Sequence, residues 1–190
     1  SDFCSSFINL IHLTLHENYF LSIRILSSST EFLYNVYDYI PRDSDLFQSY
    51  LSFFESFFYA TYESINQDPI QTFNCLFYGY DELKTTQKIL ISLLQASEIK
   101  IDSIVMLLIK NFNDLIKNEN QYSLIFDVKI SLIIYITSII IRYDFFDSCK
   151  NKSDQNLTVF LFNFFIESSE KLGEYKIDSD LAELYASERM

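Results

Sequence analysis

Two histidines in the segment IHLTLHENY have the spacing that zinc ligands use on a helix. His12 and His16 are four residues apart, so a helix would place both imidazoles on one face. A structural zinc site needs four ligands, but the chain has no third histidine, and Cys4 would lie two turns upstream on an adjacent stripe. Glu17 follows the second histidine, whereas the general base of a metalloprotease follows the first. The sequence therefore predicts no metal and no cofactor, with histidines that are half-buried or lie in an interface.

Serines, cysteines and paired carboxylates give no catalytic pattern. Asp43 with Asp45, and Asp178 with Asp180, lie beside predicted helix starts, where a carboxylate caps the helix and complements its dipole. No serine lies in a glycine-flanked elbow, and no cysteine lies in a recognisable nucleophile motif. We therefore predict that the protein is not an enzyme, and an enzyme of an unrecognised family is the alternative.

The composition restricts the fold that positions these residues. The 190-residue chain contains two glycines and two prolines, far below the ordinary usage of about 7% and 5%. Few residues then remain that favour hairpins, tight turns or a phosphate-binding loop. Helices joined by polar segments are the expected elements. We predict a single all-α domain over residues 1–190, either whole or part of a longer helical-repeat protein.

Apolar periodicity and capping residues predict nine helices. The expected ranges are about residues 3–26, 28–40, 43–64, 69–78, 82–96, 101–117, 121–149 and 157–172, with a ninth starting near residue 180. The third helix carries a broad aromatic stripe, and the first has residues at helical spacing along one stripe, which are Phe3, Phe7, Leu10, Ile11, Thr14 and Leu15. The predicted N-caps are Ser28 (in a capping box with Glu31), Asp43 or Ser44, Asp68, Asp81 and Asp180, and the predicted C-terminal caps are Gly79 and Gly173.

Successive helix pairs begin near residues 3, 43, 81 and 120, about forty residues apart. Repeats of roughly forty to forty-seven residues characterise HEAT and armadillo solenoids, in which each unit buries its apolar face against its neighbours. In the fourth unit, Asp127-Val128-Lys129 before an apolar run resembles the Asp-Val-Arg/Lys signature of a HEAT repeat. The resemblance implies a short HEAT-like α-solenoid of stacked antiparallel hairpins. A closed multi-helix bundle is the alternative.

The most apolar segment is ISLIIYITSIII, at residues 130–141. A membrane-spanning helix needs about twenty predominantly apolar residues, and charged residues, Lys129 and Arg142, bracket this shorter run. A helix that is apolar nearly all round belongs in a core covered on two sides. We therefore predict a core helix, with Ile134 buried and no membrane span.

The formal net charge of −12 indicates the kind of partner. Through residue 80, nine acidic residues accompany two basic ones, Arg24 and Arg42. A negative field disfavours non-specific binding to nucleic acid and to anionic lipid. The predicted partner is therefore a protein, most simply a basic or amphipathic helical segment, rather than a nucleic acid or a small molecule.

Three scattered cysteines in apolar sequence, with no signal peptide, predict an intracellular protein of the cytoplasm or nucleus.

Three tyrosines near the end of the second predicted helix are the best interface candidates. Tyr34, Tyr37 and Tyr39 cannot all face inward on one helix, because offsets of two and three residues spread them around it. Arg42 beside them could bind an acidic group of the partner. We expect these four residues to bind a partner, in a non-enzymatic module that acts as a scaffold or adaptor subunit. A Bcl-2-like bundle, whose apolar groove binds one helical peptide, is the alternative.

Overall fold

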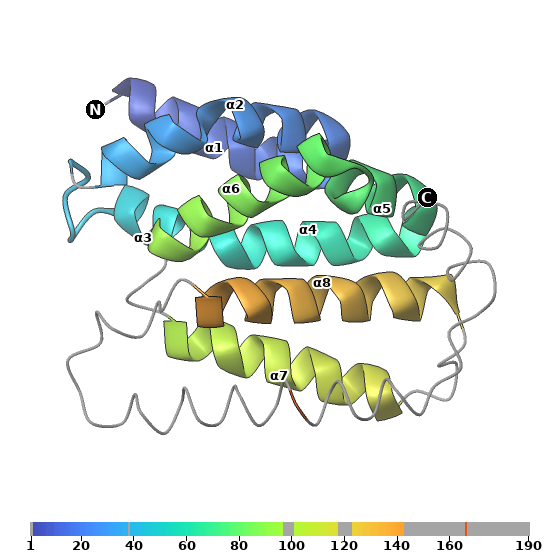
Figure 1. Cartoon of the computed structure of the whole chain (residues 1–190). Coiled ribbons are helices and arrows are strands. Elements are labelled where there is room, and N and C mark those ends of the chain that lie inside the picture. Colours follow the sequence, from blue (N-terminus) through green and yellow to red (C-terminus); the bar gives the residue numbers. More distant parts are fainter. Residues whose placement is uncertain (1, 38, 97–100, 118–122, 143–165, 167–190) are drawn as a thin grey trace.

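The computed structural model describes residues 2–37, 39–96, 101–117, 123–142 and 166. Over these residues the chain forms eight helices and no strand, so the predicted all-α class is confirmed (Figure 1). The helices are α1 (Asp2–Glu17), α2 (Tyr19–Tyr37), α3 (Asp45–Leu51), α4 (Phe53–Gln67), α5 (Pro69–Phe77), α6 (Tyr80–Ala96), α7 (Ile101–Lys117) and α8 (Leu124–Arg142). The predicted eighth and ninth helices, apart from Ile166, lie outside the described residues, as do residues 143–149 of the seventh.

The chain reverses direction at Asn18, between α1 and α2. The side-chain oxygen of Asn18 accepts a hydrogen bond from the backbone amide of Leu21 over 3.1 Å, so Asn18 caps α2. The rings of Phe7 and Phe32 lie 5.3 Å apart, edge to face. Since these residues are far from the turn, their contact shows that α1 and α2 form an antiparallel pair, as Figure 1 also shows.

The predicted capping box at Ser28 and Glu31 is wrong. Ser28 lies inside α2, and its hydroxyl donates a hydrogen bond to the carbonyl of Arg24 over 3.1 Å. A serine bonded to the preceding turn continues a helix instead of starting one. The break predicted here belongs instead at Asn18, which has the same capping chemistry.

Four other predicted helix ends can be compared with the structure. Ser44 caps α3 by accepting from the amide of Phe47, and Asp68 caps α5 by accepting from the amide of Gln71, so both predictions are confirmed. Asp81 is not a cap, because α6 already begins at Tyr80 and the amide of Leu83 donates to the carbonyl of Gly79. Gly79 follows the end of α5 with a φ of +87°, a conformation that favours glycine.

The helices pack as a closed group around α4. This helix contacts α1, α2, α3, α5, α6 and α8. In terms of the forty-residue units, α2 of the first unit packs on α6 of the third, and α4 of the second packs on α8 of the fourth. Units of a solenoid contact only their immediate neighbours. The solenoid arrangement is therefore not confirmed, and these contacts are those of a multi-helix bundle.

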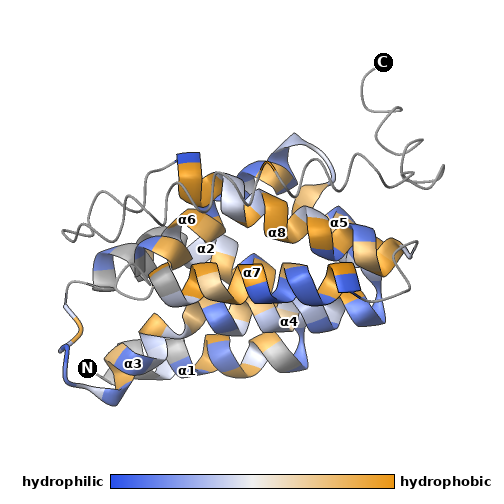
Figure 2. Cartoon of the chain, turned by 90° about the horizontal axis from the view of Figure 1, so that it is seen from below, coloured by the Kyte–Doolittle hydropathy of each residue, from blue (hydrophilic) through white to orange (hydrophobic). Residues whose placement is uncertain are grey.

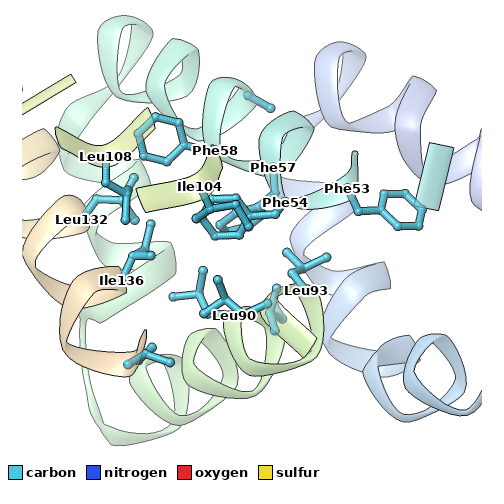
Figure 3. Packing of buried hydrophobic residues seen from close by; sticks show 14 of the residues in the cluster. Phe53, Phe54, Phe57, Phe58, Leu90, Leu93, Ile104, Leu108, Leu132 and Ile136 are labelled. Carbon is cyan, nitrogen blue, oxygen red and sulfur yellow. The ribbon is translucent and has the colours of Figure 1, made fainter. Parts of the chain in front are cut away.

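Aromatic side chains of α4 fill the centre of the bundle. Phe54, Phe57 and Phe58 are fully buried, and Phe53 is nearly so. Figure 3 shows these rings beside apolar side chains from three other helices. The labelled neighbours are Leu90 and Leu93 of α6, Ile104 and Leu108 of α7, and Leu132 and Ile136 of α8.

Helix α8 lies within this core and contacts α4, α5, α6 and α7. Hydrophobic residues dominate it (Figure 2), and each residue from 124 to 141 is at least partly buried. By length and composition α8 is the one described helix that could cross a membrane, a test that core helices of soluble proteins also pass. Ile134, predicted to be buried, is only partly so, whereas its neighbours Ile133 and Ile136 are fully buried.

We predict that Ile136→Asp unfolds the bundle, because it places an unpaired carboxylate in an apolar core. The free energy of unfolding should fall by about 4 kcal/mol or more. Urea titration followed by circular dichroism measures this change. Met106→Asp is the matched control, since Met106 is exposed on α7, and it should change stability by less than about 0.5 kcal/mol. Equal effects of the two substitutions would show that α8 is not part of the core.

Candidate interaction surface

The segment between α2 and α3 holds Tyr39 on the outside of the bundle. We call residues 39–44 the tyrosine turn. Tyr39 is 86% exposed, whereas its neighbour Ile40 is 4% exposed and anchors the turn in the core. The hydroxyl of Ser44 donates to the carbonyl of Pro41 over 2.6 Å and accepts from the amide of Phe47 over 3.1 Å. The backbone of the turn is therefore held at both ends while the phenol ring remains in solvent.

Arg42 lies on the same turn and is oriented by an aromatic ring. Its guanidinium carbon lies 4.7 Å from the centroid of Phe47, a cation–π contact. Phe47 itself is buried at the start of α3, so the arginine covers the edge of the core while its charge remains exposed. Exposed Asp43 and Asp45 follow directly. The turn and the first residue of α3 thus present one oriented cation beside two carboxylates.

The structure brings two of the four predicted interface residues together. Tyr39 and Arg42 share the tyrosine turn and both are exposed. The second predicted helix was expected to reach residue 40, but α2 ends at Tyr37, so the argument from helical offsets does not apply to Tyr39. The side chains of Tyr34 and Tyr37 lie outside the described part of the structure. Partner binding by the four residues stays a prediction.

A second exposed aromatic group lies where α5 meets α6. Tyr78 and Tyr80 flank Gly79, and Tyr80 is 76% exposed. Tyr135 of α8 supports this corner, because its hydroxyl donates to the carbonyl of Leu83 over 3.3 Å. This corner was not predicted from the sequence. The segment YGYDEL gives a usable signal, since a glycine that ends a helix marks a connection, and connections lie at the surface.

His12 is a structural residue at the junction of α3 and α4. Its Nε2 lies 3.0 Å from the carbonyl oxygen of Ser49, which can only accept, so Nε2 carries the proton. In the neutral ring Nδ1 then accepts from the hydroxyl of Ser56, 3.1 Å away. The imidazole also stacks on Phe53 with 4.4 Å between ring centroids. Both ring nitrogens are thus engaged within the chain.

Potential metal ligands do not gather within the described residues. No group of three or more histidine, cysteine, aspartate or glutamate side chains in this part of the chain could hold a metal ion. The side chains of His16 and Cys4 lie outside the described residues.

Cys75 is a free, half-buried thiol whose pKa is raised by burial and by the charge of Glu82, so it is a poor nucleophile.

A half-buried lysine joins α8 to α4. The Nζ of Lys129 donates to the side-chain oxygen of Asn66 over 2.5 Å and lies 5.0 Å from the centroid of the Tyr62 ring. Burial lowers the pKa of Lys129 and raises that of Tyr62. These contacts link two helices of the core, so the Asp127-Val128-Lys129 segment has a packing role in this fold.

Comparisons of the chain with protein-family models, with curated proteins and with solved structures each found no match. The resemblance to HEAT repeats therefore rests on the sequence features alone, and a function has to be inferred from the surface.

We predict that the purified protein contains no stoichiometric zinc. Elemental analysis should find less than about a tenth of an equivalent, because a structural zinc site needs four ligands and His12 uses both ring nitrogens for hydrogen bonds. One equivalent of zinc that survives dialysis, and is lost in His16→Ala, would contradict this prediction.

We predict that His12→Phe destabilises the fold although it keeps the aromatic stacking. The substitution removes the hydrogen bonds to Ser49 and Ser56, at a cost of about 1–3 kcal/mol in the free energy of unfolding. Ser56→Ala removes only one of the two bonds and should cost about 0.5–1.5 kcal/mol. Chemical denaturation of the three proteins measures both differences. If the His12→Phe variant were as stable as the wild type, the histidine would stabilise the fold only through the stacking of its ring.

Proposed function

We propose that the protein is a non-enzymatic interaction module, a scaffold or adaptor subunit that binds another protein through the tyrosine turn. The single observation that carries this proposal is Tyr39, a large aromatic side chain that is 86% exposed on an anchored turn. Tyrosine and arginine are enriched among the residues that dominate binding energy in protein interfaces. Tyr39 and Arg42 supply one of each within four residues.

The ordering of the turn supports a role in binding. Association costs free energy when loops and side chains must be immobilised. Here the bonds of Ser44 and the burial of Ile40 already fix the backbone, and the Phe47 ring already orients Arg42. A partner that covers Tyr39 therefore meets a surface that needs little reorganisation.

The charge around the turn favours a basic or amphipathic partner. Asp43 and Asp45 are exposed next to Tyr39 and Arg42, and the whole chain has a formal net charge of −12. Such a field attracts cationic segments and speeds their encounter. A helix with lysines or arginines beside an apolar stripe would place its apolar side chains on Tyr39 and its cations beside the two aspartates.

We predict that Tyr39→Ala combined with Arg42→Glu weakens partner binding by at least about 2 kcal/mol, the range of strong interface residues. A photo-crosslinking amino acid at position 39 would first identify the partner in cells. Calorimetric titration of the purified partner, at low and high ionic strength, then compares wild type with the double variant. Raised salt should slow association of the wild type, since the attraction is electrostatic.

A matched double variant tests the specificity of this effect. Tyr59→Ala with Lys110→Glu removes an exposed tyrosine and reverses an exposed base on α4 and α7, away from the turn. It should bind like the wild type. Unchanged affinity of the Tyr39 and Arg42 variant, with normal melting, would place the interface elsewhere, and a crosslink at position 39 to no protein would argue against the proposal as a whole.

A further inference from the structure

The helix that follows the tyrosine turn is interrupted after seven residues. α3 ends at Leu51 and α4 begins at Phe53, so a single residue, Ser52, separates them (Figure 1). In a continuous α-helix the carbonyl of Ser49 would accept from the amide of the residue four positions ahead, which is Phe53. Here the carbonyl of Ser49 accepts from the amide of Ser52, over 3.2 Å. The regular ladder of backbone hydrogen bonds is therefore broken at this point.

The imidazole of His12 lies beside the break and contacts both helices. On the α3 side, Nε2 donates to the carbonyl of Ser49 over 3.0 Å. On the α4 side, the ring stacks on Phe53, and Nδ1 accepts from the hydroxyl of Ser56 over 3.1 Å. A side chain that enters the backbone ladder is a sufficient cause of a sharp bend in a helix. The break contains neither glycine nor proline, so His12 is such a side chain where the usual local causes are absent.

The direction of α3 determines where the tyrosine turn lies. Ser44 is both the last residue of the turn and the N-cap of α3, and the guanidinium of Arg42 lies over the ring of Phe47 in α3. The turn is therefore joined to α3 by backbone and side-chain contacts. Seven residues of α-helix are about 10 Å long, so a change of about 30° at the break would displace the turn by about 5 Å.

We propose that His12 is a positioning residue for the tyrosine turn, because its bond to Ser49 holds the break between α3 and α4 open. Without this bond, the carbonyl of Ser49 becomes available to the amide of Phe53, and the two helices shift towards a single straight helix. The consequence for binding rests on the proposed function. The position of the turn can be measured without a partner, so the two parts are tested separately.

Two other features offer competing explanations of the break. The hydroxyl of Ser52 donates to the carbonyl of Gln48 over 3.0 Å, and a bond of this kind often bends a helix. In addition, α3 buries three large side chains in the core, and these could fix its direction without the histidine. They are Phe47, Tyr50 and Leu51. The variants below distinguish these explanations.

Pulsed electron paramagnetic resonance measures the position of the turn. One spin label replaces Asp43, and the other replaces Glu17, Lys88 or Met106, which are exposed positions on α1, α6 and α7. Labels on unnatural amino acids leave the cysteines unchanged. In His12→Phe, which keeps the stacking but has no donor, at least one of the three distances should change by about 3 Å or more. The distance between labels at Lys88 and Met106 is the control and should not change.

Two further variants identify the cause of the shift. His12→Gln keeps an N–H donor in place of Nε2, so it should restore the wild-type distances. Ser52→Ala removes the competing hydroxyl and should also keep them. Ser56→Ala removes the group that orients the imidazole, so the turn should shift in the same direction as in His12→Phe, but less far. Circular dichroism checks that every variant is folded.

The binding measurement uses the partner identified by crosslinking at position 39. His12→Phe should weaken its binding about tenfold, although His12 lies outside the turn, because the surface is no longer preorganised. His12→Gln should bind like the wild type. Unchanged binding by the Tyr39 and Arg42 double variant would contradict the proposed function but would leave the measured distances as they are, so the two failures are distinguishable.

Three results would overturn the inference. One is a folded His12→Phe variant with wild-type distances, which would show that the buried side chains of α3 fix its direction. If that variant does not fold, wild-type distances in Ser56→Ala count in the same way. Another is a His12→Gln variant whose turn shifts as far as that of His12→Phe, which would exclude the bond to Ser49 as the cause. The third is unchanged partner binding by a His12→Phe variant whose turn has moved.

Discussion

Burial of the aromatic side of α4 is the constraint on which the rest of the structure depends. Four phenylalanines within six residues cannot be covered by one neighbouring helix, because they occupy a broad sector of the helix surface. Helices from both ends of the described chain therefore pack around α4. One buried polar group of α4, the Thr61 hydroxyl, is paired both within the helix and with a neighbouring helix. Thr61 donates to the carbonyl of Phe57 and so accepts from the buried hydroxyl of Tyr19, which joins α2 to α4.

Much of the local structure could be predicted from the sequence because it depends on neighbouring residues. The all-α class follows from the scarcity of glycine and proline, and the caps at Ser44 and Asp68 follow from side chains that bond amides three residues ahead. The break between α3 and α4 at Ser52 was missed. It is associated with a contact that no local pattern contains, the bond from His12 to the carbonyl of Ser49, thirty-seven residues away.

Packing partners were harder to predict than helices. A forty-residue period fixes the lengths of helices and connections, but a solenoid and a bundle can share those lengths, so the period does not decide which helices touch. The same limit applies to the surface. Tyr39 lies beyond the end of α2, where offsets along a helix do not apply. Leu10 and Ile11 both fit an apolar stripe of α1. Only the position of α3 and α4 decides which of these two neighbours is buried.

The contact between α2 and α6 has a consequence for the order of folding. During synthesis α1 and α2 leave the ribosome before α6, the helix against which α2 packs, because α6 begins some forty residues after α2 ends. Contacts between distant segments slow folding, because the loop between them must close before the contact contributes. The nascent first hairpin therefore keeps its inner apolar side uncovered until α6 has emerged. In the cell, that interval is when the chain most needs a chaperone.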